Sequence, residues 1–181
     1  MRPALISRAQ VLDATLRLAS EKGLSAVTMR SVATRLGVSP MALYRHVGDK
    51  QGLLDGLVER LMTEVAGAEE NTDEDWRVPL RGLAANMRRT ARQYPDLFIL
   101  LFQRRAVTPA AVAARDAVYR ALRAAGVAES ELDRLERMIS TFMLGFAASE
   151  AGGRFAGIDA DVEFRYAEER IEQLIAAAVR G

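Results

Sequence analysis

Two short helical segments, separated by a break of three or four residues, constrain the fold more than any other feature of this sequence. In "SVATRLGVSPMALYRHVGDK", residues 31–50, an apolar pattern of helical spacing stops at Gly37 and resumes behind Ser39 and Pro40. Gly37 favours the left-handed conformation that ends a helix, Ser39 suits an N-cap, and Pro40 suits the first helical position. Two short helices joined this tightly predict a helix-turn-helix unit.

The rest of the chain shows helical spacing only. Apolar residues recur at intervals of three and four and never sustain period-two alternation, so the sequence predicts an all-α fold. A first helix is expected from Ser7, which forms a capping box with Gln10, to Gly23. A second is expected from its N-cap Thr28 to Gly37. After the short third helix, further helices are expected over about 51–66, 75–93, 95–105, 109–125, 130–152 and 161–179.

The polar, acidic segment "GAEENTDED", residues 67–75, is the best candidate for a domain boundary. We therefore predict a helix-turn-helix domain over residues 1–50, a connecting helix over about 51–66, and a second helical domain over residues 67–181.

The composition is that of a folded protein, with 50% hydrophobic and 27% charged residues. The absence of cysteine excludes disulfides, zinc–thiolate sites and thiol catalysis. The start "MRPALISRAQ" lacks the apolar run of a signal peptide, and no window approaches the roughly 18 apolar residues of a membrane span. We expect a cytoplasmic protein without a membrane partner.

The charges divide unevenly along the chain. Residues 1–60 contain nine Lys and Arg against five Asp and Glu, whereas residues 61–181 carry a small excess of acid. A polyanionic partner is therefore expected to bind the amino-terminal third.

The third predicted helix has side chains suited to reading DNA. Its first residues are small or apolar and can approach base edges, and two of them suit a thymine methyl group. These residues are Ser39, Pro40, Met41 and Ala42. Tyr44 can donate its hydroxyl to a phosphate, and Arg45 can bind guanine O6 and N7 through two hydrogen bonds.

Neighbouring segments add phosphate-binding groups. Thr28 and Arg30 open the second helix, and Lys50 opens the fourth, so three backbone segments supply contacts to one face. A helix-turn-helix can also serve as a protein-binding module. A helical adaptor that never meets DNA is thus the alternative function.

The sequence offers little support for an enzyme. It has a single histidine, His46, and no G-x-S-x-G, no phosphate-binding glycine-rich loop and no H-E-x-x-H motif. A carboxylate pair hidden among the helices is the remaining route to catalysis. We predict no catalytic residues, no cofactor and no metal.

Five linked motifs within residues 8–60 resemble the amino-terminal domain of the TetR family of bacterial transcriptional regulators. They are the helix ending at G-L, T-x-R, V-A-x-x-L-G-V-S, L-Y-x-H, and K-x-x-L-L at Lys50 to Leu54. The resemblance implies that the base-reading end of the third helix is residues 39–42. It implies DNA contacts at these positions: Thr28, Arg30, Tyr44, His46 and Lys50. The family often has an aromatic residue where this chain has Arg45, so no known operator can be carried over.

The carboxy-terminal part resembles the tetracycline-repressor branch more faintly. The matching features are W-x-x-x-L at Trp76, an arginine before Thr108, and F-x-L-G-F at Phe142. The resemblance implies a small-molecule effector bound between the middle helices. It also implies a homodimer formed through the helices at about 130–152 and 161–179, and hence repression at a pseudo-palindromic operator that the effector relieves.

The effector itself is expected to be apolar. The histidine with which tetracycline repressors hold drug-bound magnesium aligns with Leu101, so no such metal is expected here. Arg105 could meet an acidic group of the ligand, although plain core packing is an alternative explanation for each apolar candidate. The candidate ligand-binding residues are Leu83, Met87, Leu101, Phe102, Arg105, Met138 and Phe142.

Overall fold

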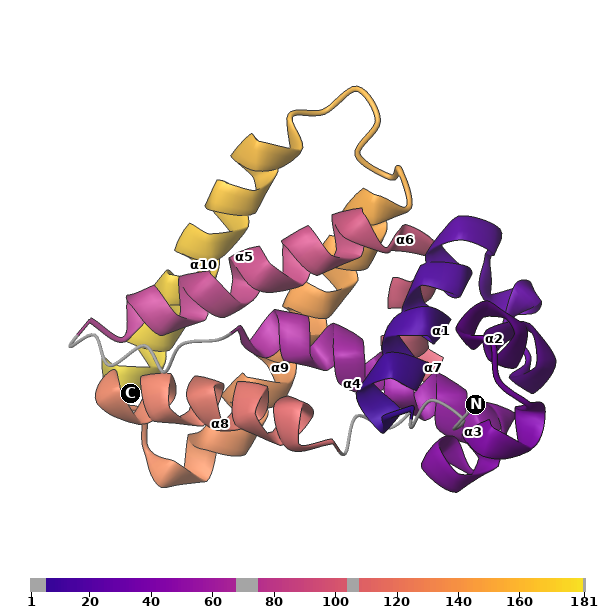
Figure 1. Ribbon diagram of the computed structural model, residues 1–181. Helices are drawn as coiled ribbons and strands as arrows, with labels where there is room; N and C mark the ends of the chain where they lie inside the picture. Colours follow the sequence, from indigo (N-terminus) through magenta and orange to yellow (C-terminus); the bar gives the residue numbers. More distant parts are fainter. Residues whose placement is uncertain (1–5, 68–74, 104–107, 181) are drawn as a thin grey trace. The chain divides into compact units, whose positions relative to one another are not determined.

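The computed structural model describes residues 6–67, 75–103 and 108–180, and these residues contain helices and no strands, which confirms the all-α prediction (Figure 1). None of the described helices is long and apolar enough to cross a membrane. The helices are α1 (Arg8–Lys22), η1 (Leu24–Ala26), α2 (Met29–Leu36), α3 (Pro40–Val47), α4 (Lys50–Ala66), α5 (Arg77–Gln93), α6 (Pro95–Phe98), α7 (Leu100–Gln103), α8 (Pro109–Ala124), α9 (Glu129–Ala151) and α10 (Ala160–Arg180).

The chain divides into two compact units. The first comprises residues 1–62 and 96–106, and the second comprises residues 63–95 and 107–181. The division after Met62 lies inside α4, and α6 and α7 belong to the first unit. The domain limits expected from the sequence stay a prediction.

The first three α-helices begin at the residues expected as their caps. Ser7 and Gln10 make a capping box at α1, and Thr28 makes one with Ser31 at α2. Gly37 ends α2 in the left-handed conformation, with φ 67° and ψ 30°. Ser39 is the N-cap of α3, but its side chain does not accept a hydrogen bond from that helix.

The core of the first unit holds the helix-turn-helix in place. Helices α1, α2 and α3 contact one another, and Val32 and Leu43 are fully buried. Helix α4 lies close against α1, because a Cβ added to Gly56 would lie 2.1 Å from Leu12 Cδ2. The ion pair of Arg8 with Glu59, at 2.7 Å, joins the same two helices.

The segment expected to form one helix from about 95 to 105 contains two short helices in its described part. The hydrogen-bonding pattern restarts at Ile99, whose carbonyl accepts from the amides of Phe102 and Gln103. Ile99 and Phe102 are exposed, whereas Leu97, Phe98, Leu100 and Leu101 are buried.

The second unit is built on mutual contacts of α5, α8 and α9, with α10 packed on α9. Its core comprises Ala84, Val118, Leu122, Val127, Leu132, Leu135, Ile139, Met143, Phe164 and Ile175.

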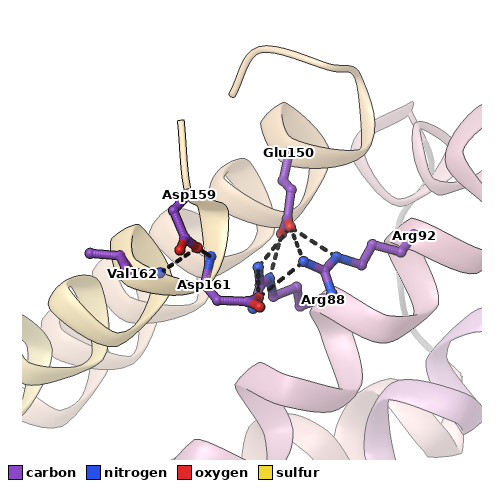
Figure 2. Close-up of polar contacts among 6 residues, drawn as sticks. All are labelled: Arg88, Arg92, Glu150, Asp159, Asp161 and Val162. Atoms are coloured by element: carbon purple, nitrogen blue, oxygen red, sulfur yellow. Dashed lines mark hydrogen bonds and ion pairs between the residues drawn. The ribbon is translucent and has the colours of Figure 1, made fainter. Parts of the chain in front are cut away.

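An ion cluster with Arg88 and Glu150 buried at its centre joins the start of α10 to α5 and α9 (Figure 2). Arg88 of α5 donates to both carboxylate oxygens of Glu150, at 2.5 and 2.7 Å, and its guanidinium also lies 2.6 Å from Asp161 of α10. Arg92 donates to the same Glu150 at 2.5 and 2.8 Å. The guanidinium of Arg88 stacks on Phe164, 4.6 Å from the ring centre. Three helices therefore share one network of charge-assisted hydrogen bonds.

Candidate DNA interface and effector cavity

Helix α3 is anchored by one face and presents the other to solvent. Leu43 is fully buried, whereas Met41 is 72% exposed and Tyr44 is 46% exposed. Ser39, Pro40 and Arg45 are also exposed, and Ala42 and His46 are half-buried. Every predicted DNA-contacting residue on this helix is therefore at least partly accessible.

The basic side chains of the first unit fall into two groups. Arg30, Arg45 and Lys50, which were predicted to contact DNA, are exposed and form no ion pair with any described residue. Arg17 and Lys22 of α1 share this property. The other group is already neutralised by acidic partners, in the pairs Arg8–Glu59, Arg35–Glu21 and Arg60–Asp13. The cations left available for phosphates thus include those at the start of α2, on α3 and at the start of α4.

The start of α2 also offers backbone donors. The Thr28 hydroxyl accepts from the Ser31 amide at 3.0 Å, and the carbonyl of Thr28 accepts from Val32. The amides of Met29 and Arg30 have no acceptor among the described residues, as expected for the first positions of a helix. Two N–H groups without an acceptor among the described residues, on the helix that carries Arg30, suit a phosphate.

Two polar residues complete this surface. The Ser39 hydroxyl makes no hydrogen bond within the part of the chain that the structure describes, so it is free to donate to DNA. Asp49 accepts from the Gly52 amide at 2.9 Å and thereby caps the helix on which Lys50 stands. Sequence reasoning missed Asp49, although an aspartate three residues before Gly52 is a capping signal.

The second unit contains a cavity between α5, α8, α9 and α10, with a volume of about 520 Å³ including its open mouth. Most of its wall is apolar. The lining residues are Leu80, Arg81, Leu83, Ala84, Met87, Val118, Ile139, Ser140, Met143, Glu168, Ile171 and Glu172.

The structure brings together only some of the predicted ligand-binding residues. Leu83 and Met87 line the cavity. Met138 and Phe142 lie on the exposed face of α9, where they are 45% and 48% exposed. Of the remaining three, Leu101 is buried and Phe102 exposed in the first unit, and Arg105 lies outside the described residues.

The polar residues of the cavity differ in whether they already have partners. Arg81 donates to Glu172 at 2.6 Å, and Ser140 donates to Glu136 at 3.0 Å. Glu168 forms no hydrogen bond or ion pair with a described residue. Burial raises the pKa of its carboxyl, and this effect outweighs the attraction of Arg81, Arg88 and Arg165.

Metal-binding geometry is absent from the part of the chain that the structure describes. No group of three or more His, Asp or Glu side chains there could hold a metal ion.

Two family profiles cover most of the chain. Residues 11–57 match "Bacterial regulatory proteins, tetR family", and residues 68–180 match "Tetracyclin repressor-like, C-terminal domain". The chain belongs to the TetR family. This assignment confirms the predicted class of a helix-turn-helix transcriptional regulator rather than an enzyme.

Relatives of known function include two repressors. The chain is 33% identical to the tetracycline repressor protein class C of Escherichia coli over 85% of its own length and 72% of that protein. It is 30% identical to the HTH-type transcriptional repressor DrrR1 of Streptomyces coeruleorubidus over 78% of its length. The second match spans 52% of DrrR1, so this TetR-family chain corresponds to about half of that relative.

Solved structures share the fold along nearly the whole chain. BioQ with its double-stranded DNA operator aligns with a TM-score of 0.76 at 25% identity, covering 95% of this chain and 99% of BioQ. ActR of Streptomyces coelicolor in complex with actinorhodin aligns with a TM-score of 0.83 at 21% identity, covering 97% of each chain. The ActR comparison supports the fold alone.

Proposed function

We propose that this TetR-family chain is a repressor that binds a pseudo-palindromic operator as a homodimer and releases it when an effector binds. The observation that carries the DNA-binding part is the pattern of charges on the first unit. Arg30, Arg45 and Lys50 are exposed and form no ion pair with a residue that the structure describes, whereas three other arginines of the unit are neutralised. Unpaired cations around an exposed helix are what binding to a phosphate backbone requires.

Helix α3 is the recognition helix of this proposal. Ser39, Met41 and Arg45 approach base edges, and Arg45 discriminates guanine through two hydrogen bonds. Phosphates are held by Tyr44, Lys50 and the free amides at the start of α2. Ala42, Pro40, His46 and Thr28 complete the contact surface.

The dimer is proposed to form through the exposed apolar faces of α9 and α10. Met138 and Phe142 stand one turn apart on α9, and a Cβ added to Gly145 would meet nothing within 4 Å, so a partner helix could approach there. On α10, Val162 and Tyr166 are 47% and 58% exposed at the same spacing. Exposed apolar stripes of this kind are typical of helical interfaces. A two-fold dimer would place its α3 helices about 34 Å apart, which is one turn of B-DNA.

The effector is proposed to bind in the cavity of the second unit. Its wall is mostly apolar with a few polar groups, which is the character of small-molecule pockets. Coupling of about 1 to 3 kcal/mol between effector and operator would change DNA affinity roughly 5- to 150-fold. Helix α4 belongs to both units and is the continuous element that could carry this coupling.

Selection of bound sequences from a random duplex pool tests the DNA-binding part. The proposal predicts enrichment of a two-fold symmetric site. An adaptor that never meets DNA predicts a pool without enrichment, and binding that stays at non-specific levels of roughly 10⁻⁴ to 10⁻⁶ M for every duplex at physiological salt.

A further inference from the structure

We propose that the cavity of the second unit selects an amphiphilic cation, in which an apolar body fills the space between α5, α8 and α9 and an ammonium group pairs with Glu168. This inference rests on the proposed function, because it names the chemical class of the effector. It replaces the expectation of an acidic ligand group, which depended on Arg105.

The body of the ligand must be apolar. The interior wall combines Leu83 and Met87 of α5, Val118 of α8, and Ile139 and Met143 of α9. No polar group among these side chains could replace the water that a hydrophilic body would lose on entry. Burial of apolar surface is therefore the main source of affinity.

The polar atoms at the cavity decide the charge of the ligand. Arg81 is already neutralised by Glu172, and Arg77 lies 3.5 Å from the same carboxylate. Ser140 uses its only proton toward Glu136, so its oxygen remains as an acceptor. Glu168 offers a carboxylate without a partner among the described residues. Arg81 keeps N–H donors beyond the one it gives to Glu172, but its charge is balanced, so the lining charge without a partner among the described residues is that of Glu168.

A cation satisfies this arrangement, and an anion does not. A carboxylate ligand would place a second negative charge beside Glu168 in a partly desolvated site, and the charge of Arg81 is already balanced by Glu172. An ammonium group instead supplies donors to the Glu168 carboxylate and forms a charge-assisted hydrogen bond. The lining groups therefore favour a ligand with one positive charge at the end of an apolar body.

The test uses three probes that share one apolar body: 4-phenylbutylamine, 4-phenylbutanol and 4-phenylbutyrate. Each is titrated into the full chain at neutral pH, with calorimetry as the primary readout. The single tryptophan, Trp76, stands one turn before the lining residue Leu80 and provides a second readout by fluorescence. We expect the amine to bind roughly tenfold more tightly than the alcohol, since tenfold corresponds to about 1.4 kcal/mol, within the range of one hydrogen bond to a charged group. The butyrate should bind more weakly than the alcohol.

Matched variants locate the selectivity. Glu168→Gln should abolish the preference for the amine over the alcohol while retaining binding of the alcohol. Glu169→Gln changes the adjacent exposed carboxylate and should leave the preference intact. Melting curves of both variants confirm that they fold.

Several outcomes would overturn the inference. They are equal affinity for the amine and the alcohol, tighter binding of the butyrate than of the alcohol, or a preference for the amine that survives Glu168→Gln. The absence of measurable binding of the amine at about 1 mM would also overturn it. Operator binding without any probe is measured in parallel. Loss of specific DNA binding would refute the proposed function, whereas a wrong probe preference with intact operator binding would refute only the ligand class.

Discussion

Replacing Arg88 by Met tests whether the ion cluster of Figure 2 holds α10 in place. Arg88 is buried, and the side chain of its partner Glu150 is only 7% exposed. Removing one partner of a buried pair costs about 3 to 5 kcal/mol, because the other charge is left uncompensated. Arg92 would still donate to Glu150, so we expect a loss below this range, about 2 to 3 kcal/mol in the free energy of unfolding.

Urea denaturation followed by circular dichroism measures this loss, and the melting temperature should fall by about 2 to 4 °C for each kcal/mol. The double variant Arg88→Met, Glu150→Met removes both charges and retains apolar packing beside Phe164. It should be more stable than the single variant, because no buried carboxylate is left without its Arg88 partner. A single variant within about 0.5 kcal/mol of the wild type, the usual range of a surface substitution, would refute this reasoning.

The same cluster predicts a pH dependence. Burial alone would raise the pKa of Glu150, but hydrogen bonds from Arg88 and Arg92 outweigh it and hold that pKa below its usual value. A hydrogen bond from Arg88, with the attraction of its charge, lowers the pKa of Asp161. A carboxyl whose folded pKa is depressed stabilises the fold fully above its unfolded pKa, which is about 4 here, and loses that contribution as the pH falls through the folded pKa. The stability difference between wild type and Arg88→Met should therefore shrink below about pH 4, in urea titrations repeated along a pH series.

Three further predictions concern other parts of the chain. Arg45→Ala should cost about 1 to 3 kcal/mol of operator affinity and relax base preference at one position of each half-site. Lys50→Ala should instead weaken binding to all DNA sequences alike and reduce the salt dependence of binding. Identical behaviour of the two variants in binding titrations would contradict the assigned roles. A Cβ on Gly52 would lie 1.8 Å from a backbone carbonyl oxygen of α3, so Gly52→Ala should destabilise the chain. Gly82 has open space around it, so Gly82→Ala should stabilise α5 by up to about 1 kcal/mol in the same urea assay. Phe142→Asp should convert the proposed dimer to a monomer in sedimentation experiments, and an unchanged mass would argue against the α9 face.

The sequence predicted the helix-turn-helix well because its signals are local. The capping box at Ser7, the cap at Thr28 and the left-handed Gly37 each depend on residues within one turn. The break between α6 and α7 was not predicted, since a run that is apolar on every side has no periodicity from which a break could be read.

The cavity could be predicted only in part because it depends on how the helices pack. Helix α9 is apolar on two faces, and the sequence alone does not indicate which face turns inward. The structure places Ile139 and Met143 in the cavity wall and leaves the neighbouring Met138 and Phe142 exposed. Glu168 resembles any surface carboxylate of a charged helix until α5 and α9 surround it.

The affinity of the full chain for its selected palindrome, compared with a scrambled duplex of the same length, tests the proposed sequence-specific DNA binding. At physiological salt we expect a dissociation constant of roughly 10⁻⁸ to 10⁻¹¹ M for the palindrome, at least about 10³-fold tighter than for the scrambled duplex. Dissociation constants within about tenfold of each other, both near the non-specific range of roughly 10⁻⁴ to 10⁻⁶ M, would contradict it.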